Sequence, residues 1–280
     1  MIFENITDGR RFTDPDAGDV LIFSRLDACT INQVAQMPSL KMVLEGEEVY
    51  RIEGRSVRIC AGQMLYVRGG QAVDVTIEER REAIGVCLYL DPDEIADTRA
   101  PFLRITPASE FIYHAEEFKY SVARGADRRE RVTNFGGDFK RSGASAVKRL
   151  AGAHARLSLR RQYKRSELLA KLEAARAYLT EHCNRTVTLE ELSAIVGLSK
   201  FYLARHFQSA YGASPMDFHR QLRVENAAKA LAQAVSTDAV AESYGYSDYS
   251  SFSKAFKRHF GQAPGEYKKA LSDMADGSWE

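Results

Sequence analysis

An internal repeat in the last third of the chain is the feature that most constrains its fold. The repeat begins at Gly197 and again at Gly245, and each glycine is followed, in the same order, by a Phe, a Gly, a Pro and an aromatic residue. These stand 10, 15, 18 and 21 residues after the first glycine and 11, 16, 19 and 22 residues after the second. One inserted residue accounts for the whole difference. The pattern predicts the same supersecondary unit twice.

A short amphipathic segment precedes each of these glycines, "TLEELSAIVG" and "STDAVAESYG". In the first, Thr188 and Glu191 have the S/T-x-x-E spacing of a capping box, and Leu192, Ile195 and Val196 supply the expected buried side. In the second, Ser236 can serve as the helix cap. Two helices joined by a tight turn that contains glycine form a helix-turn-helix unit. The sequence therefore predicts two such units.

A connecting helix is expected between the units, beginning at Pro215 with Ser214 as its cap. About 18 residues at 1.5 Å each span roughly 27 Å. That is of the order of the roughly 34 Å that separates recognition helices in successive major grooves. A period of about 50 residues could also indicate an α-solenoid, but a solenoid generally needs at least three repeats. Two copies favour the double helix-turn-helix.

Residues 166–270 resemble the C-terminal DNA-binding domain of the AraC/XylS family of bacterial transcriptional regulators. The motifs that carry the resemblance are "VTLEELSAIVGLSKFYLARHFQSAYGASPMDF" and "VAESYGYSDYSSFSKAFKRHFGQAPGEYKKA". The resemblance implies a transcription regulator that binds double-stranded DNA and contacts RNA polymerase beside a promoter. Tyr246, Lys254 and Ala204 depart from the commoner family residues, which concerns base preference more than the domain assignment.

The second helix of the first unit is the first candidate recognition helix. Leu203 and Phe207 are expected to be buried, because they lie four residues apart on one helix face. The residues left for DNA are Lys200, Phe201, Tyr202, Ala204, Arg205 and Gln208. Arg205 is the strongest candidate for a guanine contact, since its forked donors match O6 and N7. Phe201 and Ala204 can contact thymine methyl groups.

The second candidate recognition helix follows the same plan, with Phe252 and Phe256 as the buried pair. The residues available to DNA are Tyr249, Ser250, Ser251, Ser253, Lys254, Lys257 and Arg258. Ser250 and Ser251 can form hydrogen bonds with bases or phosphates, and Lys254, like Arg205, can reach guanine N7 or O6. Lys257 and Arg258 are expected to bind phosphates, which position a protein without specifying sequence. The alternative, a protein-docking platform, predicts binding without a preferred DNA sequence.

Residues 18–91 contain β-rich runs separated by glycines, which predicts a small antiparallel barrel or sandwich. The stretch "LEGEEVYRIEGRSVRICAGQMLYVRGGQ" resembles the cupin-like regulatory domain of the same family. In that family the barrel binds a small effector and the following helices dimerise, which implies an effector and a homodimer here. The resemblance identifies neither the effector nor its contact residues. After Asp91, "DPDEIADTRAPFLR" has the start signals of a helix, with Pro92 in its first turn.

These patterns predict an α+β chain in three parts. Residues 1–110 form a cupin-like sensory domain, 111–165 a basic helical linker that can dimerise, and 166–272 the DNA-binding domain. Residues 1–138 hold 17 basic and 24 acidic side chains, whereas residues 139–165 hold 9 basic ones and no acid. We therefore expect effector binding to change how the acidic domain packs on the basic linker. The alternative is a ligand-independent regulator whose N-terminal domain only dimerises.

An enzymatic cupin is a rival of a different class, but its metal needs two or three imidazoles and a carboxylate. All six histidines lie outside residues 18–91: His114, His154, His182, His206, His219 and His259. We therefore expect no enzyme, no catalytic residue, no metal and no cofactor. The chain begins without the pattern of a signal peptide, and its four cysteines lie far apart without a C-x-x-C pair. A cytoplasmic location is expected.

Overall fold

The computed structural model describes residues 2–6, 19–78, 82–95, 98–124, 128–231 and 236–275. Contacts divide the chain into two compact units, Met1–Glu173 and Ala174–Glu280. The division falls within helix α3 (Gln162–Glu181), which begins in the first unit and ends in the second. No helix in these described ranges is long and apolar enough to cross a membrane. The α+β class is confirmed.

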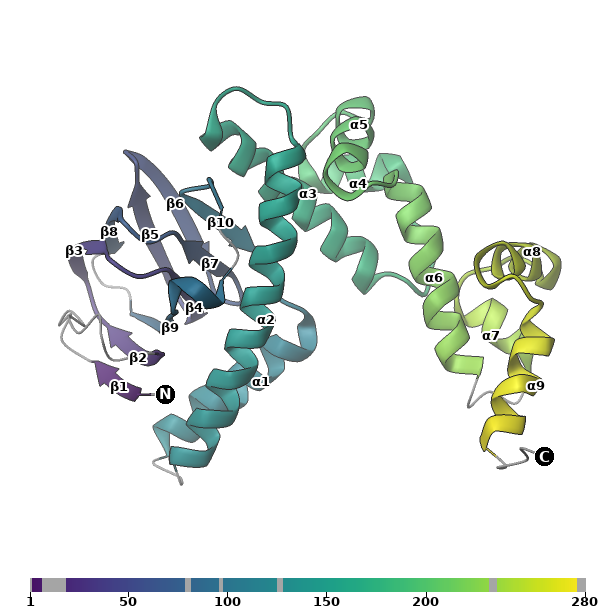
Figure 1. Ribbon diagram of the computed structural model, residues 1–280, viewed down its shortest axis with the longest axis horizontal. Helices are drawn as coiled ribbons and strands as arrows, with labels where there is room; N and C mark the ends of the chain where they lie inside the picture. The colour runs from purple at the N-terminus through teal and green to yellow at the C-terminus, as the bar shows by residue number, and fades with distance from the viewer. Residues whose placement is uncertain are drawn as a thin grey trace. The chain divides into compact units, whose positions relative to one another are not determined.

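Two sheets make up the first part of the first unit (Figure 1). The larger has the order β1 (Ile2–Ile6), β2 (Val20–Leu26), β9 (Ala83–Tyr89), β4 (Ser39–Glu45), β7 (Met64–Val67) and β10 (Phe102–Ile105). The smaller has the order β3 (Cys29–Ala35), β8 (Gln71–Ile77), β5 (Glu47–Ile52) and β6 (Arg55–Cys60). Neighbouring strands pair antiparallel, except that β1 pairs with β2 in parallel.

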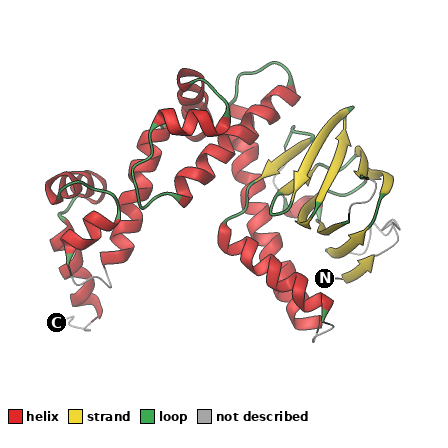
Figure 2. Cartoon of the chain, turned by 180° about the vertical axis from the view of Figure 1, so that it is seen from behind, coloured by secondary structure: helices red, strands yellow, loops and turns green. Residues whose placement is uncertain are grey.

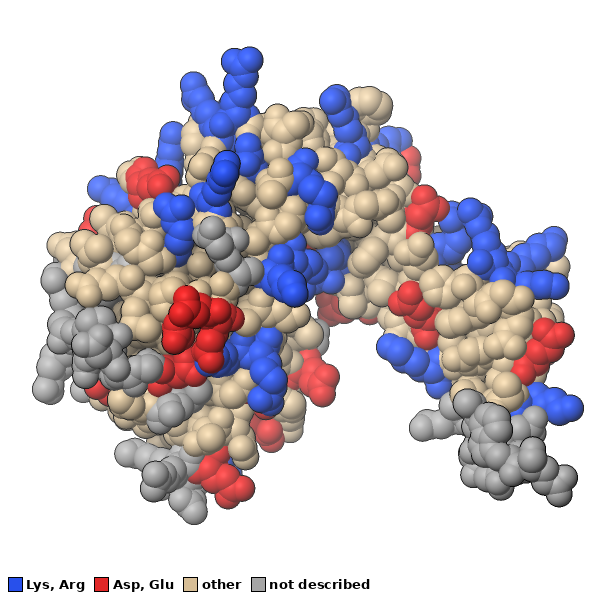
Figure 3. Space-filling view, viewed as in Figure 1, with Lys and Arg blue, Asp and Glu red and all other residues tan. Residues whose placement is uncertain are grey.

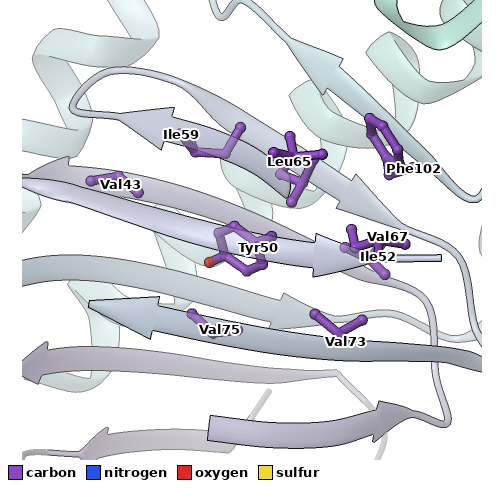
Figure 4. Packing of buried hydrophobic residues seen from close by; sticks show 10 residues of the cluster. Val43, Tyr50, Ile52, Ile59, Leu65, Val67, Val73, Val75 and Phe102 are labelled. Atoms are coloured by element: carbon purple, nitrogen blue, oxygen red, sulfur yellow. The ribbon is translucent and has the colours of Figure 1, made fainter. Parts of the chain in front are cut away.

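A hydrophobic core joins the two sheets (Figure 4). Alternate residues of one strand point to the same face, so every second side chain of β5 and β8 can enter this layer. The buried cluster consists of Val43, Tyr50, Ile52, Val57, Ile59, Leu65, Val67, Val73, Val75 and Phe102. The described ladders form two sheets and no closed ring. The cupin-like barrel is therefore not confirmed, and the arrangement agrees with the sandwich alternative.

The segment after Asp91 differs from the sequence expectation. Asp91 caps a single 3-10 turn, η1 (Pro92–Glu94), by accepting a hydrogen bond from the Asp93 N–H at 2.9 Å. Ile95 then takes an extended conformation, with φ −119° and ψ 143°, and ends the turn. The chain continues into β10, which pairs with β7. The expected helix was therefore wrong beyond its first turn.

Two long helices, α1 (Ser109–Ala123) and α2 (Arg128–Arg156), pack on each other and on the larger sheet. Their contact contains a stacked aromatic pair, Phe118 and Phe135, with ring centroids 4.2 Å apart. Gly143 allows α2 to approach β4, because a Cβ there would lie 2.1 Å from Leu40 Cδ1. The basic segment is partly neutralised within this unit, since Lys140 pairs with Asp19 at 2.5 Å.

The second unit contains the end of α3 and six further helices in its described residues (Figure 2). They are α4 (Leu189–Val196), α5 (Lys200–Tyr211), α6 (Pro215–Leu231), α7 (Thr237–Ser243), α8 (Tyr249–Phe260) and α9 (Pro264–Ala275). Side chains of Thr188, Ser199, Ser236 and Asp248 cap the helices that follow them. Gly197, with φ 61°, ends α4 in the left-handed conformation. The two predicted helix-turn-helix units, α4–α5 and α7–α8, are present.

Candidate nucleic-acid interface

The buried side of each candidate recognition helix, α5 and α8, matches the sequence prediction. Leu203 and Phe207 of α5 are fully buried, and so are Phe252 and Phe256 of α8. These pairs occupy the fourth and eighth positions of their helices. Because each pair is fixed in the interior, the opposite face of each helix is held outward at the same rotation.

The outward face of α5 contains the residues predicted for DNA. Lys200, Phe201, Tyr202, Arg205 and Gln208 are exposed, and Ala204 is half-buried. Phe201 is 78% exposed, which is unusual for a large apolar ring and marks a candidate contact surface. Lys200 pairs with Glu190 Oε1 at 2.5 Å, whereas Arg205 has no ion pair within the described part of the chain. Arg205 is therefore the available cation of this face.

The outward face of α8 is polar and basic. Tyr249, Ser250, Ser251, Lys254, Lys257 and Arg258 are exposed, and Ser253 is half-buried. The Ser251 hydroxyl donates to Asp248 Oδ2 at 2.8 Å, and the Ser251 N–H donates to Asp248 Oδ1 at 2.7 Å. These bonds lower the pKa of Asp248. Ser251 therefore takes part in the helix cap, so that Ser250 is the better candidate of the two adjacent serines for a contact outside the chain.

Buried Arg223 of α6 connects the two helix-turn-helix units, and the sequence analysis missed it. Its Nε donates to the Tyr244 carbonyl at 2.8 Å, and its Nη1 donates to Thr186 Oγ1 at 3.3 Å. Its guanidinium lies over the Tyr246 ring at 4.3 Å, and burial lowers its pKa. The available signal was a cation four residues after His219, on the helix face that also contains Ala227 and Leu231. Through these contacts Arg223 joins Thr186, just before the first helix-turn-helix unit, to the turn of the second helix-turn-helix unit.

The turn at Gly245 packs directly against residues 185–186, which precede the first helix-turn-helix unit. Gly245 has φ +71°, and a Cβ there would lie 2.9 Å from Arg185 Cα and 3.2 Å from Thr186 N. Only glycine allows this approach in this conformation. The glycine that defines the second repeat therefore also sets the packing of the two units.

An ion pair holds the start of α4 against the end of α3. Arg185 Nη2 and the Tyr178 hydroxyl each donate to Glu191 Oε1 at 2.6 Å. Together they lower the pKa of Glu191 to about 2, with Arg185 as the largest cause. Thr188 Oγ1 accepts from the Glu191 N–H at 3.1 Å, which confirms the cap predicted there.

Ile195 lies differently from the sequence expectation: it was expected to be buried in α4 but is 49% exposed. His206, for which no sequence pattern indicated burial, is 8% exposed, with its ring 4.2 Å from that of Tyr202. Burial, followed by the nearby Arg205 charge, lowers the pKa of His206. A neutral imidazole therefore packs behind the exposed face of α5.

Known proteins are similar in sequence to this second unit, and one of them also to part of the first. Residues 192–270 match a helix-turn-helix domain family. The MmsAB operon regulatory protein of Pseudomonas aeruginosa is 25% identical over 240 residues, covering 84% of this chain and 76% of the relative. An AraC-like transcription regulator of Streptomyces lividans is 36% identical over 86 residues, covering 30% of this chain and 28% of the relative.

The second unit is an AraC-type helix-turn-helix domain. A further family relative is the RCS-specific transcriptional activator RclR of Escherichia coli, which is 36% identical over 89 residues and 31% of each chain. With this relative and the Streptomyces regulator, the similarity spans less than a third of their lengths. The family match contains all of α5 and α8, and therefore both outward faces of this AraC-type domain.

Proposed function

We propose that the chain binds double-stranded DNA at a preferred sequence through α5 and α8 and thereby regulates transcription. The observation that carries this proposal is the equivalence of the two exposed faces. Arg205 and Lys254 occupy the sixth position of their helices, each between two fully buried side chains at the fourth and eighth positions. A helix of this kind can enter a major groove and contact base edges.

The side chains divide into two groups by chemistry. Arg205 suits guanine O6 and N7, while the exposed Phe201 ring and Ala204 suit thymine methyl groups. On α8, Ser250 and Lys254 can contact bases, and Lys257 and Arg258 suit phosphates. Helix α6 has 17 residues and therefore spans about 26 Å, which is compatible with recognition helices in neighbouring grooves.

The test is binding of the full chain to the DNA upstream of its own coding region across a salt series. Arg205→Ala should cost about 1–3 kcal/mol and relax the preference at one base position. Lys229→Ala removes an exposed charge from α6 and is the matched control. Loss of preference in the control, or equal binding by all three proteins to every sequence, would contradict the assignment of Arg205. Binding that ignores salt and sequence would favour a protein-docking platform.

We further infer that the first unit is a cupin-like sensory domain for a small polar effector. This is supported by charged side chains in the layer between its sheets: Lys41 and Glu48 are only 9% and 6% exposed. Lys41 Nζ lies 3.2 Å from Cys87 Sγ, and among the described residues the buried Ser39 hydroxyl has no hydrogen-bond partner. Buried polar groups without partners are rare and suit polar ligands.

The effector proposal is tested by the unfolding temperature of the full chain with a panel of small polar metabolites. A ligand that binds only the folded state raises this temperature and should also change the affinity for DNA. If no compound does either and the chain is found to be a dimer, the first unit serves dimerisation, as in the ligand-independent alternative. We also propose the division of the chain into three parts, residues 1–110, 111–165 and 166–272. The DNA-bound chain is further proposed to contact RNA polymerase.

A further inference from the structure

A hollow of about 340 Å³ lies between the end of α5, one face of α6 and the end of α8. Its polar lining comprises Gln208, Ser214, Asp217, Arg220, Gln221, Arg258 and His259. Gln208 belongs to the outward face of α5 and Arg258 to that of α8. The hollow is therefore continuous with both proposed DNA-contacting faces. Figure 3 shows Lys and Arg side chains gathered where α6 and α8 meet.

One carboxylate organises the cations of this hollow. Asp217 Oδ1 accepts from Arg220 Nη1 at 2.6 Å, and Asp217 Oδ2 accepts from the Ser214 hydroxyl at 2.7 Å. Ser214 and Arg220 lower the pKa of Asp217, and the charge of Arg258 adds to the effect. Two arginines thus share one acid, which leaves a net positive charge. Arg220 and Asp217 are each about half exposed, so this charge is accessible.

We propose that Arg220 and Arg258 bind one phosphate of the DNA backbone that passes between the two grooves contacted by α5 and α8. The inference rests on the proposed function and adds α6 to the contact surface. If α5 and α8 lie in successive major grooves, the helix that connects them crosses the phosphate backbone between those grooves. A guanidinium suits a phosphate because its parallel N–H donors match two phosphate oxygens. Asp217 is a positioning residue that orients Arg220.

The contact carries no sequence information, so its loss has a signature different from that of a base contact. Arg220→Gln and Arg258→Gln should each weaken binding by the same factor on specific and unrelated duplexes. One neutralised phosphate contributes about 0.9 to the slope of log affinity against log salt. The double variant should therefore lower this slope by about 0.9 in total, because both arginines contact the same phosphate.

The matched control is Lys229→Gln. Lys229 is an exposed cation of α6 nine residues after Arg220, which places it about half a turn around the helix. Its slope should stay at the wild-type value. A double variant with an unchanged slope would overturn the phosphate contact, and a fall of about 1.8 would overturn the shared phosphate in favour of two separate ones. Equal unfolding temperatures for all variants exclude loss of folded protein.

The same measurements separate this inference from the proposed function. If the wild-type chain shows no preference for any duplex, the proposed sequence-specific binding fails. If the wild-type chain binds specifically and Arg205→Ala relaxes that preference, the function stands. In that case an unchanged slope in the Arg220 and Arg258 double variant contradicts the phosphate site alone.

Discussion

The guanidinium of Arg223 lies 4.3 Å from the centre of the Tyr246 ring and donates to the carbonyl of Tyr244, two residues earlier. Arg223 belongs to α6, whereas both tyrosines flank the turn of the second helix-turn-helix unit. Arg223 makes a third contact with Thr186, which precedes the first helix-turn-helix unit, α4–α5. One buried cation therefore fixes the turn of one unit against the entry of the other.

Arg223→Met should destabilise the second unit strongly. The change keeps most of the side-chain length but leaves the Tyr244 carbonyl and the Thr186 hydroxyl without this donor. Hydrogen bonds from charged groups contribute about 1.5–3 kcal/mol each, and the contact with the aromatic ring adds to this. Chemical denaturation followed by circular dichroism measures the loss. Arg220→Met, at a half-exposed position of the same helix, is the control and should change stability little.

Gly245→Ala should cost more than Gly212→Ala, although both glycines have positive φ. Left-handed backbone costs about 1–2 kcal/mol for a residue with a Cβ. At Gly212 nothing lies within 4 Å of the added Cβ, whereas at Gly245 it would meet the backbone of Arg185 at 2.9 Å. The loss of unfolding free energy in Gly245→Ala minus that in Gly212→Ala measures the cost of the steric clash at Gly245 alone. Equal losses would mean that the backbone of residues 185–186 moves away without cost.

Stability of the first unit should fall between pH 6.5 and about 4 because of His154. This histidine is 2% exposed, and burial, followed by the charge of Arg165, lowers its pKa from 6.5 to about 4. Above pH 6.5 the imidazole is neutral in both states, and below it the unfolded chain binds the extra proton. Stability is therefore fully present above pH 6.5 and is lost as pH falls through the folded pKa.

The measurement for His154 is the unfolding free energy from pH 4 to 8. His154→Gln cannot bind this proton, so its pH dependence in that window should be weaker than that of the wild type. A variant with the same slope as the wild type would assign the pH dependence to other groups.

Asp248→Ala should destabilise α8 by about 1 kcal/mol, the usual cost of losing a helix cap. Its carboxylate accepts from the Ser251 N–H and from the hydroxyls of Ser247 and Ser251. Asp248→Asn should retain most of the stability, because asparagine is also a good cap. Thermal unfolding of the two variants provides the comparison. Similar losses for both would show that the charge, rather than the capping oxygen, stabilises this end.

Sequence predicted the second unit well because its determinants are local. Caps such as Ser236, the left-handed Gly197 and the buried Phe pairs each act within one helix or turn, where spacing alone identifies them. Arg223 was missed because its partners lie 21 and 37 residues away along the chain. His206 and Ile195 depend on which neighbouring helix covers them, which periodicity does not specify.

The first unit was less predictable because strand pairing is non-local. β10 pairs with β7 although Phe102 and Val67 lie far apart in the sequence, and the cap at Asp91 resembles a helix start until Ile95 becomes extended. β1 is short and pairs in parallel with β2, so no hairpin signal marks it. Glycine spacing indicated a strand-rich domain, but it did not distinguish two sheets from a closed ring.

Helix α6 determines both the distance between the two helix-turn-helix units and the rotation of one relative to the other about its axis. Inserting one residue into an α-helix lengthens it by only 1.5 Å but rotates everything beyond it by about 100°. For this chain, such an insertion would turn the face of α8 away from that of α5 while hardly changing their separation. Length changes in α6 are therefore compatible with the paired faces only near whole helical turns, of three or four residues.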